Sequence, residues 1–322
     1  EHDWDRGLNL SCSKLQEKVQ EYRMSMEKVF TRKKAEEYLE DPWGTVEPNE
    51  YSMIEDDAAE VFSNYEDSLN FPLLKALSDV AAESFSTVKG DLCLSGLTSL
   101  SESAAESLSK HKGERIDLSG LTELSDEAAE FLSKYEGELN LRGLTSLSDE
   151  VAESLSNYRG ELWLMNVTEL SDAAAESFSK HKGSLRLNGL TTLTDAAAES
   201  LSKHPGELEL EKLAELSDEA AESLARFDGD LFLFSVSSLS DAAIGFLSKH
   251  KGALSLNSLS ELSDEAAEYL SKYEGSLSLG GLTKLSETGA KSLAKIDPEE
   301  LELPESWDSG DEAIKELVSK HR

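Results

Sequence analysis

Four histidines share one position of a repeated sequence, and histidine is the side chain that most often binds metals or moves protons near neutral pH. They are His111, His181, His204 and His250. In other copies of the repeat an aromatic residue fills this position: Tyr65, Tyr135, Tyr158, Phe227 and Tyr273. A position that accepts histidine, tyrosine and phenylalanine alike requires a flat, partly buried ring. We therefore interpret these histidines as structural and expect no metal site.

Carboxylates form two further rows, and such rows could collect calcium. The rows are Glu83, Glu106, Glu130, Glu153, Glu176, Glu199 and Glu222, and Asp126, Asp149, Asp172, Asp195, Asp218, Asp241 and Asp264. Stacked repeats would place neighbouring carboxylates about 5 Å apart, the spacing of paired strands. The sequence contains neither an EF-hand loop nor a Gly-Gly-x-Gly-x-Asp repeat. We interpret the rows as helix caps and a solvated surface.

Catalytic signatures are missing from the sequence. It contains no Gly-x-Ser-x-Gly, no His-Glu-x-x-His and no phosphate-binding glycine loop. Cys12 and Cys93 are its only cysteines, and because no Cys-x-x-Cys spacing occurs we expect free thiols. The sequence therefore predicts a protein that is not an enzyme and carries no cofactor.

A regular repeat of glycines positions all these residues. The glycines are Gly90, Gly113, Gly137, Gly160, Gly183, Gly206, Gly229, Gly252 and Gly275. Their spacing is constant, except that the gap between Gly113 and Gly137 is longer by one. A fixed period of this kind, here about 23 residues, predicts a solenoid, in which each unit buries its apolar face against its neighbours.

Within one repeat, the pattern predicts a strand followed by a helix. The apolar-x-apolar triplet 139–141 places two leucines on one face of a strand. Eleven such triplets begin at Leu69, Leu92, Ile116, Leu139, Leu162, Leu185, Leu208, Leu231, Leu254, Leu277 and Leu301. Ser148 or Asp149 is a good helix N-cap, and we expect Lys134 and its equivalents in the last helical turn. The glycines are expected to reverse the chain with positive φ.

The chain divides into four predicted segments. Residues 1–47 form an N-terminal helical cap, with a helix from Ser11 to Glu40 that includes Val29 and Phe30. Residues 48–66 form a half-repeat, which has the helical half of the unit without its strand. Residues 67–304 form the solenoid, and residues 305–322 form a C-terminal cap whose helix covers residues 311–317. Caps are expected because the two ends of a solenoid are apolar.

These features resemble the leucine-rich repeat family. The Cys-x-x-Ile-Thr-Asp-x-x-Leu-x-x-Leu stretch of its cysteine-containing and ribonuclease-inhibitor-like repeats is similar to Leu144-x-x-Leu147-Ser148-Asp149-x-x-Ala152-x-x-Leu155. Here Leu replaces the Cys or Asn of the turn, and the return to the strand is shorter, giving a bacterial-type repeat. The resemblance covers roughly residues 48–320. It implies an α/β fold, a right-handed leucine-rich repeat solenoid with a parallel sheet on the concave face, short helices on the convex face and a helical N-terminal cap. It also implies a binding role.

The charge of the chain restricts its partners. Lys and Arg number 31 and Asp and Glu 65, so the net charge is −34. Phosphates would be repelled, so we expect no nucleic acid partner and no membrane insertion; no apolar run approaches the roughly 18 residues that span a bilayer. The acidic surface fits an extracytoplasmic or secreted protein, and we expect a monomer. Because the chain begins at Glu1 rather than Met, we expect a processed or trimmed form.

The outward-facing strand positions vary while the rest of the repeat is nearly copied. From them we select eight candidate ligand-binding residues: Trp163, Met165, Arg142, Arg186, Phe232, Phe234, Asn140 and Asn188. Exposed aromatic and arginine side chains are typical binding anchors. The sequence thus predicts recognition of a protein or glycan partner on the concave face. The alternative is a structural or cell-surface spacer, in which these positions are unconstrained or are covered by a terminal segment.

Overall fold

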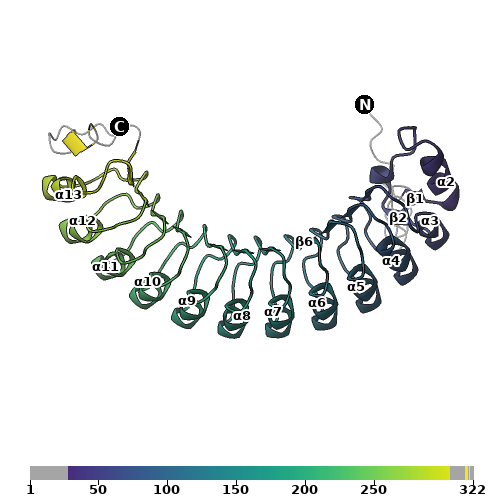
Figure 1. Ribbon diagram of the computed structural model, residues 1–322, viewed down its shortest axis with the longest axis horizontal. Coiled ribbons are helices and arrows are strands. Elements are labelled where there is room, and N and C mark those ends of the chain that lie inside the picture. The colour runs from purple at the N-terminus through teal and green to yellow at the C-terminus, as the bar shows by residue number, and fades with distance from the viewer. Residues whose placement is uncertain (1–27, 305–315, 318, 320–322) are drawn as a thin grey trace, which may run out of the picture.

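The computed structural model describes residues 28–304, 316–317 and 319 as a curved solenoid, with strands along its inner side and helices along its outer side (Figure 1). The strands are β1 (Val29–Phe30), β2 (Met53–Ile54), β3 (Leu69–Asn70), β4 (Leu92–Cys93), β5 (Arg115–Asp117), β6 (Glu138–Asn140), β7 (Leu162–Trp163), β8 (Leu185–Arg186), β9 (Leu208–Glu209), β10 (Leu231–Phe232), β11 (Leu254–Ser255), β12 (Leu277–Ser278) and β13 (Leu301–Glu302). The helices are α2 (Arg32–Glu40), the 3₁₀ helix η1 (Pro48–Glu50), α3 (Asp56–Glu60), α4 (Asp79–Ser86), α5 (Glu102–Leu108), α6 (Asp126–Leu132), α7 (Asp149–Leu155), α8 (Asp172–Phe178), α9 (Asp195–Leu201), α10 (Asp218–Leu224), α11 (Asp241–Leu247), α12 (Asp264–Leu270) and α13 (Glu287–Leu293).

Strands β3 to β13 coincide with the eleven predicted triplets, which confirms the α/β solenoid. Within each hydrogen-bonded part of the sheet they pair in parallel and in register, so that Leu69 lies opposite Leu92 and Leu231 opposite Leu254. The two apolar residues of each triplet are buried, as Leu139 and Leu141 illustrate, except that Leu303 in the last triplet is only partly buried. The residue between them lies on the other face of the strand and lines the concave side.

The hydrogen-bonded sheet divides into three parts, β3–β6, β7–β9 and β10–β13. At the first division the hydroxyl of Tyr158 accepts the N–H of Leu139 at 2.9 Å. In the next repeat the equivalent N–H, that of Leu162, bonds instead to the carbonyl of Ser184 in the neighbouring strand. The three central strands therefore form a separate unit of the sheet.

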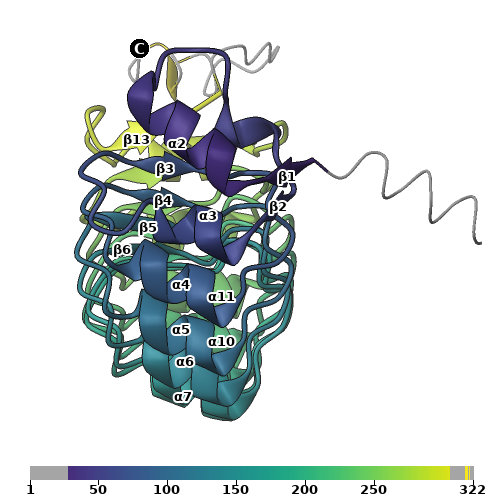
Figure 2. The ribbon, with the colours of Figure 1, turned by 90° about the vertical axis from the view of Figure 1, so that its right-hand side faces the viewer.

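Each repeat helix begins with a serine or threonine cap. The hydroxyl of Ser148 accepts the N–H of Val151 at 3.0 Å and donates to Asp126 Oδ1 of the preceding repeat at 2.8 Å. The same pair of bonds recurs at Ser171 and Ser217. The aspartate row thus joins successive helices, which stack in one column from α4 to α7 (Figure 2). This supports its interpretation as part of the caps.

The repeat glycines are needed for space and not for a left-handed backbone. No glycine in the described part of the chain has positive φ, so that expectation is wrong. A Cβ added to Gly183 would lie 2.1 Å from the carbonyl oxygen of Gly160 in the preceding repeat. A Cβ added to Gly252 would likewise lie 2.1 Å from the carbonyl oxygen of Gly229. The repeats approach each other so closely at this edge that no side chain fits.

The lysines after the helices also differ from expectation. Helix α6 ends at Leu132, so Lys134 lies beyond the last turn. Its ammonium group pairs with Glu130 at 2.9 Å, and Lys110 pairs with Glu106 at 2.8 Å. The lysine row therefore neutralises part of the glutamate row across the surface of each helix.

The N-terminal cap begins with a strand. Val29 and Phe30 form β1, which pairs in parallel with β2, so the expectation that they continue a helix is wrong. The Phe30 ring is fully buried against the rings of Tyr51, Phe62 and Phe71. A β-branched residue and a buried aromatic favour an extended backbone over a helix. Helix α2 follows and packs on α3, which covers the end of the helix column.

The half-repeat also contains a strand. Because β2 lies within residues 48–66, the expectation that this segment lacks a strand is wrong. The N–H of Glu55, the N-cap residue of α3, donates to the carbonyl of Phe30 at 3.1 Å. Pairing with β1 thus gives this segment the same strand–helix order as the complete repeats.

Several predicted features lie outside the described residues. They include the first part of the N-terminal helix, Cys12, and most of the C-terminal cap at 305–322. In that cap Glu316, Leu317 and Ser319 are helical, and Leu317 is buried. Cys93 is a free thiol among the residues that the structure describes.

Candidate functional site

The predicted ligand-binding residues lie along the concave side in two groups. The first is on or just after β6, β7 and β8 and contains Asn140, Arg142, Trp163, Met165, Arg186 and Asn188. The second is on or just after β10 and contains Phe232 and Phe234. The first group combines an aromatic residue with side chains from neighbouring strands, whereas the second comes from β10 and the residues directly after it.

Trp163 is the centre of the first group. The Arg142 guanidinium carbon lies 4.7 Å from the centroid of its ring and that of Arg186 lies 4.9 Å away. Both distances fall within the range of cation–π attraction. The Trp163 Nε1–H donates to Glu161 Oε2 at 3.2 Å. The two arginines come from the strands on either side of β7, so the indole ring lies between two cations.

Glu209 completes this group, although the sequence analysis did not select it. Its carboxylate pairs with Arg186 Nη1 and accepts a hydrogen bond from Asn188 Nδ2 at 2.9 Å. Arg186 and Glu209 are register partners in β8 and β9. Opposite charges at the same position of successive repeats were the sequence signal for this pair. We call Arg142, Trp163, Arg186, Asn188 and Glu209 the Trp163 cluster.

The exposure of the predicted residues requires corrections. Asn140 is only 4% exposed, and its Oδ1 accepts the N–H of Arg142 at 3.1 Å, so it shapes the turn and is not available to a ligand. Asn188 is 5% exposed. Trp163, Met165 and Phe232 are partly buried. Phe234 remains exposed at 37%.

The Trp163 cluster contains polar atoms without partners. Arg142 forms no ion pair within the described residues. Its Nε, the Nε of Arg186 and the Oδ1 of Asn188 are buried and have no hydrogen-bond partner in the same part of the chain. Buried polar groups are normally paired. These three polar atoms of the Trp163 cluster are therefore exceptions to the usual pairing of buried groups within the described residues.

The second group is an apolar pair beside a groove. The rings of Phe232 and Phe234 stack with centroids 5.6 Å apart and planes 23° apart. Phe232 also lines a groove of about 440 Å³, together with Leu208 and the Glu209 of the Trp163 cluster. Glu209 thus connects the two groups, which form one surface from β6 to β10.

The histidine position is structural in this fold. The rings of His181 and His204 stack with centroids 6.0 Å apart, and His204 Nδ1 lies 3.1 Å from the carbonyl oxygen of Phe178. Burial lowers the pKa of both imidazoles. At the same position Tyr135 donates to the carbonyl of Gly113, and burial raises the pKa of Tyr158 to about 12. In residues 28–304 and the short C-terminal piece, no group of three or more His, Cys, Asp or Glu could hold a metal ion.

The described helices are too short and too polar to cross a membrane.

Comparison with known proteins defines the fold. No protein-family model and no curated protein matches the sequence. A solved leucine-rich repeat protein of Leptospira interrogans is 20% identical, with a TM-score of 0.50 over 84% of this chain and 75% of that one. Drosophila Toll, solved with Spatzle, is 14% identical over 76% of this chain but only 37% of its own length, with a TM-score of 0.49. An internalin of Listeria monocytogenes is 14% identical, covers 89% and 92%, and has a TM-score of 0.40.

The Leptospira likeness and the repeated parallel strand–helix units define the class of this protein. Its fold is that of a leucine-rich repeat solenoid. At 20% identity this similarity shows the fold only.

Proposed function

We propose that this solenoid is a non-enzymatic recognition protein, which binds a protein partner on its concave face through the Trp163 cluster and the phenylalanine pair. The observation that carries the proposal is the position of Arg142. It is a cation without a carboxylate partner among the described residues, held beside an aromatic ring in a chain of net charge −34. Arginine and tryptophan are the residues most enriched among binding anchors.

The geometry favours a protein partner over a glycan. Sugars bind by stacking on an open aromatic face, and both neighbours of Trp163 place a guanidinium group over its ring. A carboxylate of a peptide would instead accept charge-assisted hydrogen bonds from Arg142. An adjacent apolar side chain would contact Phe234 and the groove beside Phe232. The partner segment is therefore extended, with a carboxylate and an apolar residue.

We also assign the repeats to the cysteine-containing and ribonuclease-inhibitor-like type and the protein to a monomeric state. The first rests on the Leu144–Leu155 pattern, whose Ser148 is the observed helix cap. The alternative role, a spacer without a specific site, gives no reason why buried arginine Nε atoms without partners should occur in both repeats that flank Trp163.

The test selects a random-peptide display library on the immobilised protein and measures the affinity of an enriched peptide for variants. Trp163→Ala should weaken binding by about 2 kcal/mol or more, which is about 30-fold. Arg142→Ala should weaken it for peptides that carry a carboxylate. Asn70→Ala is the matched control, because Asn70 is exposed on the concave side of β3, away from the cluster.

Three results would contradict the proposal. Failure to enrich any peptide supports the spacer. An enriched peptide that binds Trp163→Ala as tightly as the wild type places the contact elsewhere. Binding of a glycan array that is lost in Trp163→Ala shows that the partner is a glycan.

A further inference from the structure

Helix α11 departs from the repeat on the convex side. Gly245 stands where Glu222 and Glu268 stand in the two adjacent helices. The next residue, Phe246, replaces the serine found at Ser223, and Tyr269 makes the same replacement in α12. The ring of Tyr269 lies beside Gly245, 3.2 to 3.4 Å from where a Cβ would be. One carboxylate is therefore lost and two aromatic rings are gained at neighbouring positions.

The loss of this carboxylate leaves Lys249 without its usual partner. Six equivalent cations pair with a glutamate four residues earlier: Lys110–Glu106 at 2.8 Å, Lys134–Glu130 at 2.9 Å, Lys180–Glu176 at 3.3 Å, Lys203–Glu199 at 3.1 Å, Arg226–Glu222 at 2.6 Å and Lys272–Glu268 at 3.3 Å. The equivalent Lys295, which has Lys291 at that position, pairs with Glu268 of the preceding repeat at 3.9 Å. Gly245 occupies the partner position for Lys249. Its ammonium instead lies 5.2 Å from the centroid of the Phe246 ring, and within the described residues no carboxylate pairs with it.

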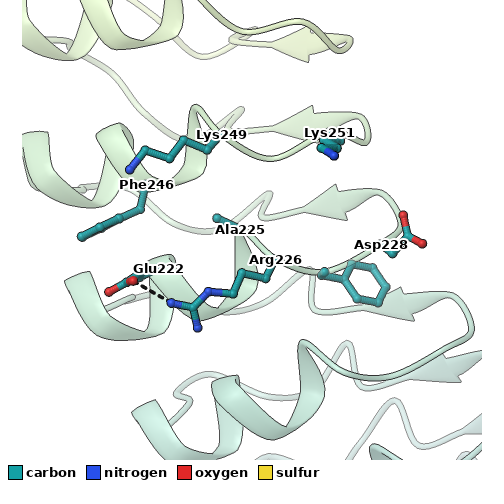
Figure 3. Close-up of a pocket in the computed structure, with 8 residues that line it drawn as sticks. Glu222, Ala225, Arg226, Asp228, Phe246, Lys249 and Lys251 are labelled. Carbon is teal, nitrogen blue, oxygen red and sulfur yellow. Dashed lines mark hydrogen bonds and ion pairs between the residues drawn. The ribbon is translucent and has the colours of Figure 1, made fainter.

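Two hollows flank Phe246. The first has a volume of about 540 Å³ and is lined by three cations, two carboxylates and three apolar residues: Arg226, Lys249 and Lys251, Glu222 and Asp228, and Ala225, Phe227 and Phe246. Figure 3 shows Phe246 and Lys249 on one repeat, facing Glu222 and Arg226 on the repeat before it. The second, of about 480 Å³, lies on the side of Gly245 and Tyr269. Phe246 and Lys249 line both.

We propose that this surface, formed by Arg226, Gly245, Phe246, Lys249 and Tyr269, binds an acidic segment of a partner protein. A carboxylate of that segment takes the place at Lys249 that the repeat elsewhere fills with its own glutamate. An apolar side chain next to it packs against Phe246 and Tyr269. The surface is on the helical side, so its occupation is independent of the concave site.

Local charge outweighs the net charge of the chain at this surface. At physiological ionic strength the screening length is about 8 Å, so the distant carboxylates of the solenoid contribute little. Of the two carboxylates that line the first hollow, Glu222 is already paired with Arg226, and Asp228 forms no ion pair with Lys249. An incoming carboxylate therefore meets the cation of Lys249, which the chain itself leaves uncompensated.

The repeat around Phe131 provides a natural comparison. A hollow of about 530 Å³ lies beside Phe131, and Lys134 lies 5.1 Å from the centroid of its ring. In that repeat Glu130 is present and pairs with Lys134. The two sites share size and the contact between a lysine and an aromatic ring. The Phe131 site has the carboxylate, and it lacks the second ring because Ser154 stands at the position of Tyr269. Binding is therefore expected at Phe246 and not at Phe131.

The test measures the fluorescence polarisation of a fluorescein-labelled peptide of alternating glutamate and phenylalanine, titrated with the full chain at physiological salt. Saturable binding is expected. Gly245→Glu, which restores the repeat sequence, should weaken it about tenfold, as should Lys249→Ala, because each removes one charge-assisted contact. Lys134→Ala is the matched control and should stay within about twofold of the wild type. Circular dichroism checks that each variant is folded.

Further binding measurements distinguish this convex surface from the concave site. A glutamine–phenylalanine peptide should bind about tenfold more weakly than the glutamate peptide, since it lacks the carboxylates. Trp163→Ala should bind the glutamate peptide as the wild type does. The proposal is overturned by absence of saturable binding, by a Gly245→Glu protein that binds as tightly as the wild type, by equal affinity for the two peptides, or by loss of binding in Trp163→Ala.

Discussion

Lowering the pH from about 7.5 to about 5.5 should destabilise the solenoid through its buried histidines. Burial is the main cause that lowers the pKa of His111, His181, His204 and His250, and nearby backbone carbonyls offset it only in part. In the unfolded chain these imidazoles titrate near pH 6.5. Below that pH the unfolded chain binds more protons than the folded one. The stabilisation is therefore complete above about pH 6.5 and is lost as the pH falls towards the lower folded pKa values.

The size of the effect follows from the number of protons. One proton bound only by the unfolded chain changes the free energy of unfolding by about 1.4 kcal/mol per pH unit, so four buried histidines give at most about 5.5 kcal/mol per unit. Comparing the wild type with variants at the ring position isolates the histidine contribution to the slope between about pH 6.5 and 5.5.

The measurement is urea unfolding followed by circular dichroism at closely spaced pH values. The double variant His181→Phe, His204→Tyr should fold, because other repeats carry these rings, and should lose about half of the slope. Lys180→Ala, an exposed control in the same repeat, should keep the full slope. A wild-type stability that is flat or rises as the pH falls would refute the reasoning, as would a double variant with an unchanged slope.

Three further results are expected. Ser171→Ala should lower the free energy of unfolding by about 1 kcal/mol in urea titrations, because its hydroxyl caps α8 and donates to Asp149; an unchanged midpoint would contradict the role of the cap. Gly183→Ala should lower the free energy of unfolding by about 1–3 kcal/mol, because its Cβ would overlap a carbonyl of the preceding repeat. Gly280→Ala should lower it less in the same assay, because the nearest atom to its Cβ would be a side-chain atom 3.3 Å away. Sodium chloride should raise the melting temperature smoothly by screening the net charge of −34, and calcium should do no more than its ionic strength predicts; a sharp rise at micromolar calcium would show that the aspartate row binds ions.

Sequence periodicity was sufficient to locate every concave strand from β3 to β13. Each triplet alternates apolar and polar residues, and a constant period allows only one register between neighbours, so Leu69 to Leu301 could be placed without coordinates. The same logic placed the helix cap at Ser148 or Asp149, and the structure identifies it as Ser148. Local pattern and global packing agree in these elements, which is why both are readable from the sequence.

The errors arose where contacts between repeats override local preference. A glycine after a helix is typical of a left-handed turn. At Gly183, however, glycine is required because a Cβ would overlap the carbonyl oxygen of Gly160 in the preceding repeat. Val29 and Phe30 continue an apolar pattern of helical spacing, yet pairing with β2 and burial of Phe30 select a strand. Asn140 alternates correctly with its buried neighbours, but its amide is used by the turn.

For the candidate site, the sequence by itself determined which side chains line the concave face, because strand alternation and the constant period place Trp163, Arg186 and Phe232 there. It also determined that Arg186 lies opposite Glu209, which holds the same position in the next repeat. Only the tertiary structure decided that Arg142 reaches the Trp163 ring diagonally, that Asn188 is buried, and that Lys249 has no carboxylate beside it among the described residues. The register of the strands follows from the constant repeat length. Side-chain contacts and burial depend instead on the way in which long side chains from adjacent repeats fill the space between the strands.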